Sequence, residues 1–543
     1  MTPDTLDRLL PVRARVRPCP DPPYDRLFDP IIEDLVADGP LAHECFATRW
    51  RDDAGLSRLA AAKQAALPAP LAAELTEYHR RLGASSRSLE ALARLARGEA
   101  VCAVAGQQPA PLGGPLYSLH KISTAVGLAS VVAERTGRVC VPLFWMHGED
   151  SDFAEIRTAL FADPALQLVE RSLPEDAHTA GGILGAIPAA AMASIVDEAA
   201  RAWTGLAGRD EAVALARGSI ARGRDLGEAF SALVLALFAD EGVVVVDPRL
   251  PAFRAAARPV IERYLANGEA LAEAARRAGA WLESRTGRHP LTDSALESFV
   301  FAIEDGRRRK LSLAEARALG GAVPLSPSVA LRPVVQDAVF PTVAMACGPG
   351  ETAYLAQLRA VFEGLGVAAA SIVPRLGLTW LPPPARTLLE AAGGEPWEIV
   401  TGVDTVVRRL AEDGVPGRVR SDLESAHGAA LRGLERFAAS VRAVDASLPQ
   451  LVESARAKVD FQFQRLGEGL VGKLRHRLER EHPEWARLRY YLLPGDRLQE
   501  RRLASLEIVA YRGRSVVPAL GGRAAAHARA LTRGVNEHLL VEL

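Results

Sequence analysis

The sequence is poor in the features that mark secreted, membrane-spanning or nucleic-acid-binding proteins. Its 543 residues hold five cysteines, none in a Cys-x-x-Cys pair, and a few scattered thiols are typical of a reducing cytosol. Lysine and arginine number 65 against 66 aspartates and glutamates, which leaves a formal net charge of −1. Such a balance gives no overall field to attract nucleic acid or an anionic membrane. Any anion must therefore be bound by a local group of residues.

Export and membrane-spanning segments are also missing from the sequence pattern. Residues 1–17 mix acids, arginines and prolines, whereas a signal peptide places a basic run before an apolar stretch. The most apolar stretch, 230–247, is broken by Asp240, Glu241 and Gly242, and a spanning helix needs about 20 predominantly apolar residues. We therefore expect a cytoplasmic protein with no membrane or nucleic-acid partner, folded into two or three units.

Short apolar strands alternate with helical segments through the first 382 residues. Apolar spacing predicts a helix over 71–95, and the apolar run 101–105 then stops at Gly106. A second strand, 139–146, ends in an acidic cluster. Alternation of helices with short, wholly apolar strands is typical of a parallel sheet covered on both faces. We predict an α/β, Rossmann-like, nucleotide-binding-type core with helical connecting insertions over residues 1–382, and functional groups at its strand ends.

Residues 383–483 have the periodicity of two long helices. Mostly apolar side chains recur at alternating spacings of four and three from Leu423 to Leu448, and a second series runs from Val452 to Leu478. We predict a long antiparallel coiled-coil hairpin joined at 447–450, followed by a C-terminal segment, 484–543, that returns to the core. A self-complementary apolar stripe is most simply buried by a second copy, so a homodimer through the hairpins is expected.

The loop after the first predicted strand has the composition of an anion-binding turn. It runs from Gly106 to Pro115, contains three glycines, and precedes a helical segment that begins at Leu116. Glycines let backbone amides approach an anion, and the amino end of a helix is positive. A strand-to-helix turn with no ligand is the alternative. The residues predicted to bind nucleotide or phosphate here are Gly106, Gln107, Gln108, Gly113, Gly114 and Lys121.

Carboxylates follow the second predicted strand directly. Glu149, Asp150 and Asp152 lie within four residues of one another, with His147 beside them. Carboxylates at a strand end could bind a substrate ammonium group, accept a proton from an amine, or hold Mg²⁺. The alternative is that Asp150 or Asp152 only caps the helix that begins near Phe153.

A third segment supplies cations and a second glycine turn. Arg332 is a natural bidentate partner for a carboxylate or phosphate, although it could instead pair with Asp337 and only hold its loop. The Gly348-Pro349-Gly350 turn precedes a helical segment with Glu351 in its first turn, and Arg375 follows a strand predicted over 369–373.

Two further groups give weaker signals. His43 and Cys45 lack a second pair at metal-ligand spacing, so they do not predict a zinc site. The basic run 307–310 follows Asp305-Gly306 and is more typical of a solvated hairpin turn than of a phosphate site.

Three of these segments together resemble the bacillithiol biosynthesis cysteine-adding family. Residues 106–121 read GQQPAPLGGPLYSLHK, residues 141–156 read VPLFWMHGEDSDFAEI, and residues 326–358 contain SPSVALRPVVQD and GPGETAYLAQL. They are similar to the family's GQQPGLFGGPLYT, VPVFWxAGEDHDFEEI, SPNVLLRPVVQD and GGPGEIAYWAQL blocks. With the C-terminal PGDRLQER block, the resemblance covers residues 71–501. Ser151 stands where the family has histidine, and His147 where it has a small residue.

The resemblance implies a ligase that joins the carboxyl group of L-cysteine to the amine of glucosaminyl malate, giving bacillithiol. ATP is the expected activator of the carboxylate, with Mg²⁺ as its companion and no resident metal. The altered acidic segment keeps two alternatives open: a different carboxylate-amine ligase or nucleotidyl transferase on the same scaffold, or a non-enzymatic dimeric relative. The expected catalytic residues are Asp150, Asp152, His147 and Arg332. The expected substrate-binding residues are Glu149, Gln336, Asp337, Glu351 and Arg375, and Gly348 and Gly350 join the nucleotide-binding set.

Overall fold

The computed structural model describes residues 3–16, 29–319, 323–393, 395–442, 444–445 and 448–543. The chain forms two compact units: residues 1–380 with 494–543, and residues 381–493. The first boundary lies close to the one expected after residue 382. The second lies beyond the one expected after residue 483, because α22 (Pro483–Leu492) packs on α18 (Pro383–Ala392) and α19 (Pro396–Asp413) within the second unit.

A five-stranded parallel sheet forms the centre of the first unit and confirms the predicted α/β core. Its order is β11–β10–β2–β3–β6. The strands are β2 (Val101–Gln107), β3 (Cys140–Met146), β6 (Val244–Val246), β10 (Thr342–Cys347) and β11 (Ser371–Pro374). The chain builds from β2 to β3 and β6 on one side, and later adds β10 and β11 on the other. The order therefore reverses at β2, where open α/β sheets place their ligands.

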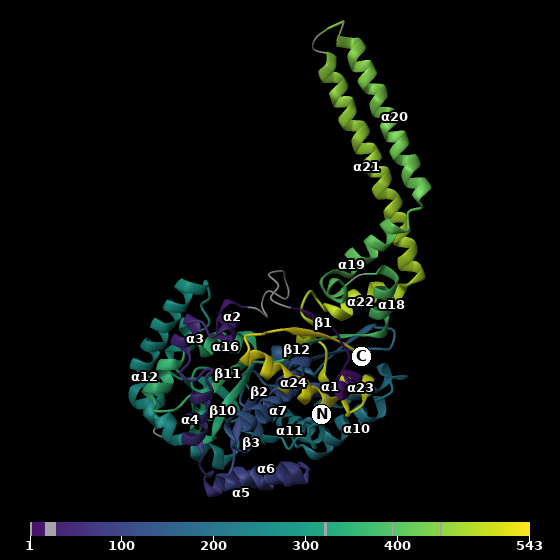
Figure 1. Ribbon diagram of the computed structural model, residues 1–543. Helices are drawn as coiled ribbons and strands as arrows, with labels where there is room; N and C mark the ends of the chain where they lie inside the picture. The colour runs from purple at the N-terminus through teal and green to yellow at the C-terminus, as the bar shows by residue number, and fades with distance from the viewer. Residues whose placement is uncertain (1–2, 17–28, 320–322, 394, 443, 446–447) are drawn as a thin grey trace. The chain divides into compact units, whose positions relative to one another are not determined.

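Helices cover both faces of this sheet (Figure 1). On one face, alternate β2 residues Val101, Ala103 and Ala105 pack among side chains of α7 (Leu116–Thr136) and α24 (Val516–Thr532). On the other face, Cys102 and Val104 join the core that includes α12 (Pro251–Thr286). This alternation follows from the two-residue repeat of a strand.

Helices α7 and α24 approach closely through a glycine. A Cβ atom added at Gly127 of α7 would lie 2.4 Å from the Ala525 backbone nitrogen. Helix α7 is also the one helix in the described part of the chain that is long and apolar enough to cross a membrane, and 78% of its apolar window is buried in this core.

Three smaller sheets complete the first unit: β7 (Val300–Glu304) with β8 (Arg307–Lys310) and β9 (Leu325–Pro327), β4 (Thr158–Ala162) with β5 (Leu168–Ser172), and β1 (Val12–Val16) with β13 (His538–Glu542) and β12 (Gly377–Leu381). The single helix expected over 71–95 is two, α5 (Ala69–Arg81) and α6 (Ser86–Ala96), because Gly83 takes a φ of +79° between them. The other α-helices of this unit are α1 (Pro3–Leu9), α2 (Pro30–Ala37), α3 (Pro40–Cys45), α4 (Asp53–Lys63), α8 (Phe153–Ile156), α9 (Ala193–Ala202), α10 (Arg209–Arg222), α11 (Leu226–Leu237), α13 (Asp293–Glu297), α14 (Leu313–Ala318), α15 (Arg332–Val339), α16 (Pro349–Leu355), α17 (Arg359–Gly364) and α23 (Ser505–Arg512).

The second unit contains the two long helices expected from the sequence, α20 (Gly417–Arg442) and α21 (Leu448–Glu481) (Figure 1). They pack antiparallel: the His427 ring stacks on Phe463 at 4.8 Å, and its Nε2 lies 2.7 Å from Asp460 Oδ1. Residue 447 of the expected junction, 447–450, lies outside the described residues.

The predicted apolar seam holds only in part. Leu423, Leu434 and Phe463 are half-buried between the two helices. Phe437 and Leu466 were expected on the same seam, but they are 56% and 59% exposed. The helix pair therefore leaves large apolar side chains uncovered within a single chain.

Candidate functional site

A cavity of about 430 Å³ lies beyond the carboxyl end of β3. Trp145, His147, Glu149 and Asp150 line it from β3 and the turn that follows. The facing wall comes from β7, β8, β9, the start of α15 and residues near α13. The lining residues from that wall are Thr292, Ser294, Ala295, Ser298, Phe301, Arg308, Lys310, Ser326, Pro327, Ser328, Val329 and Arg332, with Pro248 at the edge.

The acidic turn after β3 contributes two of its three carboxylates to the cavity. Asp150 Oδ2 accepts a hydrogen bond from Gln108 Nε2 (3.0 Å), and its Oδ1 lies 3.5 Å from Arg308 Nη1. Glu149 pairs with Arg254 at 2.8 Å, and burial raises the pKa of the Glu149 carboxyl against the opposing effect of that arginine. Asp152 caps α8 by accepting from the Glu155 amide (3.2 Å) and does not line the cavity. For Asp152 the geometry therefore favours the capping interpretation.

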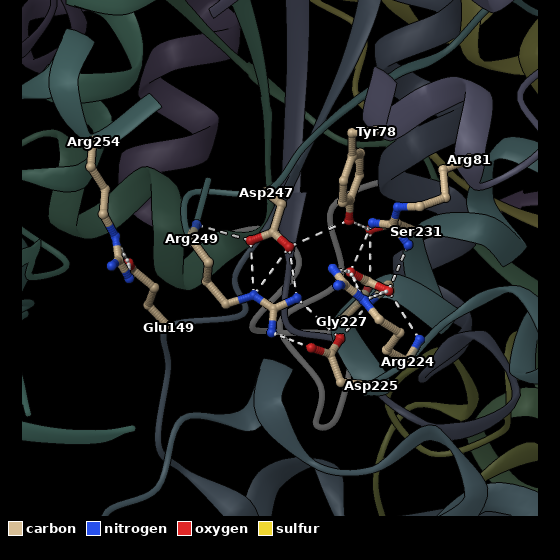
Figure 2. Close-up of polar contacts among 11 residues, drawn as sticks. Tyr78, Arg81, Glu149, Arg224, Asp225, Gly227, Ser231, Asp247, Arg249 and Arg254 are labelled. Carbon is tan, nitrogen blue, oxygen red and sulfur yellow. Dashed lines mark hydrogen bonds and ion pairs between the residues drawn. The ribbon is translucent and has the colours of Figure 1, made fainter. Parts of the chain in front are cut away.

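An arginine packs against the backbone of this turn. Figure 2 shows Arg249 between Asp247, at the end of β6, and Asp225, before α11; its Nη2 and Nη1 lie 2.7 and 2.8 Å from the two carboxylates. A Cβ atom at Gly185 would lie 2.9 Å from the Arg249 Cζ, and the Gly185 amide donates to Gly148 O (2.8 Å). Spacing does not reveal this anchor, because Asp225 lies 24 residues before Arg249 and the glycines that pack there belong to other segments.

Arg332 holds its position without a carboxylate. Its Nη2 donates to Tyr354 Oη (2.7 Å), and its Nη1 contacts His147 Nε2. In the described part of the chain no carboxylate oxygen lies within ion-pair distance of this guanidinium. The alternative that Arg332 pairs with Asp337 is wrong, because Asp337 accepts from the Ala370 amide (2.6 Å) and pairs with Lys63 (3.7 Å).

Gln336 and Asp337 were expected to bind substrate, but they do not line the cavity. Both are buried, and Gln336 Nε2 donates to Asp337 Oδ1 (3.1 Å). Together they tie the start of β10 to the segment before β11 through Thr342 Oγ1 and the Ala370 amide.

Arg308 is a cavity residue that the sequence analysis interpreted wrongly. Its guanidinium lies 3.9 Å from the Phe301 ring centroid, and its Nη2 donates to Pro327 O (3.1 Å). Its Nε is buried with no hydrogen-bond partner, and burial lowers the pKa of Arg308. Arg307 and Arg309 on the same strand are exposed. The alternation of a strand, which puts every second residue on one face, was the signal that could have found it.

The glycine loop is buried from Gly106 to Gly114 and is covered by a distant segment. Gly113 and Gly114 have φ of +82° and +68°, conformations that favour glycine. The Leu116 amide at the amino end of α7 donates to Leu503 O (2.8 Å), and the Ser505 amide donates to Gly114 O (2.8 Å). These glycines therefore meet the needs of the backbone and of close packing. Nucleotide binding by this loop stays a prediction.

Lys121 and Glu351 join the ends of β2 and β10. Lys121 Nζ lies 2.6 Å from Glu351 Oε2 and donates to Gly106 O (3.0 Å) and Gln107 Oε1 (3.1 Å). Glu351 also accepts from the Gly348 amide (3.0 Å). Both the charge of Lys121 and the amide of the second glycine turn are thus matched within the protein. A Cβ atom at Gly350 would meet nothing within 4 Å.

Arg375 pairs with an internal carboxylate. Its Nη1 lies 2.8 Å from Glu500 Oε2, and His120 Nδ1 lies 3.1 Å from the same oxygen. Burial opposes ionisation of Glu500, but Arg375 and His120 outweigh it and hold the pKa of Glu500 well below its usual value. Gln499 exchanges hydrogen bonds with the Trp380 backbone. This C-terminal motif therefore fastens its segment to the sheet, and the geometry favours a structural role for Arg375.

No group of three or more His, Cys, Asp or Glu side chains in the described residues could hold a metal ion. The carboxylates of the acidic turn point to different partners, so they offer no ready Mg²⁺ site.

Comparison with known proteins assigns the chain to a family. The family model described as "Bacillithiol biosynthesis BshC, N-terminal Rossmann-like domain" matches residues 23–321 and 316–376, which include the parallel sheet and the cavity. A "Putative cysteine ligase BshC" of Koribacter versatilis is 30% identical, over 83% of this chain and 86% of the relative. Proteins of the same description from Symbiobacterium thermophilum (30%; 83% and 86%) and Geobacillus kaustophilus (29%; 79% and 83%) are also similar. The chain therefore belongs to the bacillithiol biosynthesis BshC family.

Proposed function

We propose that this chain is a cytoplasmic ligase that joins the carboxyl group of L-cysteine to the amine of glucosaminyl malate. The names of its relatives support a cysteine ligase. The observation that carries the proposal is the cavity after β3, where carboxylates face Arg308 and Arg332 across a common space. A substrate with both an amine and carboxylates needs these two kinds of group together.

Arg332 and Arg308 are the proposed carboxylate-binding residues. Arg332 has no acidic partner at ion-pair distance in the described residues, and Arg308 keeps an unpartnered buried Nε. A guanidinium binds a carboxylate through paired donors. Asp150 faces them and would hold the substrate ammonium group and accept its proton as the amine attacks.

ATP remains the proposed activator on chemical grounds, because a free carboxylate does not acylate an amine in water. The closed loop 106–114 and the matched charge of Lys121 lend no support to a phosphate site at the amino end of α7. We therefore assign no residue to nucleotide binding. The roles proposed for the cavity residues do not depend on where the nucleotide binds.

A deletion strain tests the function directly. We expect bacillithiol to disappear and glucosaminyl malate to accumulate, and reintroducing the gene should reverse both. Unchanged thiol levels would contradict the assignment. Ser151 and His147, the departures in the acidic segment, motivate the second candidate, a ligase that makes another conjugate; a different missing thiol in the same extracts would support it.

A homodimer through α20 and α21 is the proposed assembly, with the coiled-coil packing expected from the heptads. The dimer proposal is supported by large apolar side chains that remain exposed on the two helices of a single chain. These are Val419, Phe437, Leu451, Phe461 and Leu466. Burying them between two copies removes apolar surface from water.

A further inference from the structure

Two half-buried arginines near the strand ends of the first unit are held by carboxylates. Arg249 faces Asp225 and Asp247, and Arg254 faces Glu149, as Figure 2 shows. Each of these arginines is positioned and neutralised by the same contact. Arg332 is positioned differently, because its two contacts are a histidine ring and a phenol.

The ring of His147 is placed by its backbone and by a glycine. The His147 amide donates to Gln107 O (2.9 Å), which continues the pairing of β3 with β2. A Cβ atom at Gly106 would lie 2.5 Å from His147 Nε2. Gly106 has no positive φ, so glycine serves there to leave room for the imidazole.

The protonation state of this ring follows from its neighbour. An arginine side chain has only N–H donors and stays charged. The nitrogen that faces it, Nε2, must therefore be an acceptor, which places the ring proton on Nδ1 and makes the imidazole neutral. Burial, Arg332, Lys121 and Arg308 all act in the same direction and hold the pKa of His147 well below its usual value.

We propose that His147 is a positioning residue which, together with Tyr354, holds Arg332 through neutral acceptors and so keeps its charge available for a substrate carboxylate. This proposal rests on the ligase function and assigns His147 a role other than proton transfer. It explains why the contact is an imidazole, since a carboxylate at that point would orient the guanidinium equally well but cancel its charge.

A matched pair of substitutions separates orientation from charge. His147→Gln keeps a neutral acceptor, whereas His147→Glu has the same shape and adds a carboxylate. Binding of L-malate to the full chain is measured by calorimetry, with Arg332→Gln as the reference for loss of the guanidinium. We expect His147→Gln to bind within about threefold of the unaltered protein. His147→Glu should weaken binding by about tenfold or more, as Arg332→Gln does.

The outcomes distinguish the proposal from a merely structural role and from the function itself. Equal binding by the Gln and Glu variants, with unchanged circular dichroism, overturns the proposal because charge at residue 147 would then not matter. Loss of turnover by His147→Gln with L-malate binding retained also overturns it, since that result indicates proton transfer by the ring. No L-malate binding by the unaltered protein at millimolar concentration overturns the carboxylate site. A further outcome is that the variants bind L-malate as expected but the unaltered protein forms no cysteine amide. That outcome supports the positioning role of His147 and contradicts the ligase function.

Discussion

Replacing Arg375 tests whether this residue binds substrate, as the sequence motif suggests, or fastens the C-terminal segment. Arg375→Gln leaves Glu500 in a fully buried site where the chargeable neighbours include His120, which contacts it, and His538. Removing one partner of a buried ion pair costs about 3–5 kcal/mol, because the other charge stays buried and uncompensated. We expect the lower end of this range, since His120 can take up a proton and restore part of the lost attraction. Urea unfolding of the full chain, followed by tryptophan fluorescence, measures the change.

The pH dependence gives this prediction a second arm with a definite sign. In the unaltered protein the pKa of Glu500 is depressed in the folded state. Its contribution to the free energy of unfolding is therefore fully present at pH values above the pKa of the unfolded state, and it is lost as the pH falls through the folded-state pKa. In Arg375→Gln, burial becomes the main influence and raises the folded pKa. The variant then takes up a proton on folding. Its loss of stability relative to the unaltered protein should therefore shrink as the pH falls from 7 toward 5.

A double variant provides the control. Arg375→Gln with Glu500→Gln removes the stranded charge and should recover part of the stability that the single variant loses. The reasoning is refuted if Arg375→Gln unfolds at the same urea concentration as the unaltered protein but loses L-malate binding. That outcome would return Arg375 to the substrate site.

Three further predictions test the cavity, the core and the assembly. Arg308→Gln should raise the KM for the carboxylate substrate by about tenfold or more, whereas Arg309→Gln, on the outer face of the same strand, should leave it unchanged in steady-state assays. Gly127→Ala should destabilise the protein by about 1–3 kcal/mol in urea unfolding, because its methyl group would press on the α24 backbone; equal stability would mean that the helices shift freely. Phe437→Glu with Leu466→Glu should convert the proposed dimer to a monomer by light scattering, and a monomeric unaltered protein would remove the proposal.

The sheet could be predicted because its information is local. Strands such as 101–105 are wholly apolar and are followed by glycine or acidic turns, so each gives its own signal of a buried parallel strand. Glu149 and Asp150 lie at the cavity because they follow β3, and strands of a parallel sheet end at the same edge. Arg332 begins α15 after the antiparallel strand β9, so this rule does not predict its place at the cavity.

Spacing alone does not reveal a role that a distant partner decides. Arg375 precedes Glu500 by 125 residues, and no spacing rule links them. The interpretation of Arg308 as a solvated turn residue has another cause. The basic composition of 307–310 suggested solvent, but a strand needs only one exposed face, and Arg308 and Lys310 lie on the other. The alternation within the run was more informative than its total charge.

The glycine loop shows why a motif can be specific for a family and still ambiguous in chemistry. A loop that lets backbone amides approach an anion has the same requirement as a loop that lets another backbone approach, since both need positive φ and no side chain. Here the approaching group is the chain itself: Leu503 O occupies the first amide of α7, and the Ser505 side chain lies 3.1 Å from a Cβ built at Gly113. Gly113→Val would therefore disturb packing whether or not a nucleotide binds, and cannot separate the two interpretations. Ser505→Gly removes the side chain beside Gly113 and leaves the loop sequence unaltered. If the loop binds nucleotide, the Ser505→Gly variant should keep the nucleotide affinity of the unaltered protein. If the loop has only a packing role, neither the variant nor the unaltered protein should bind nucleotide.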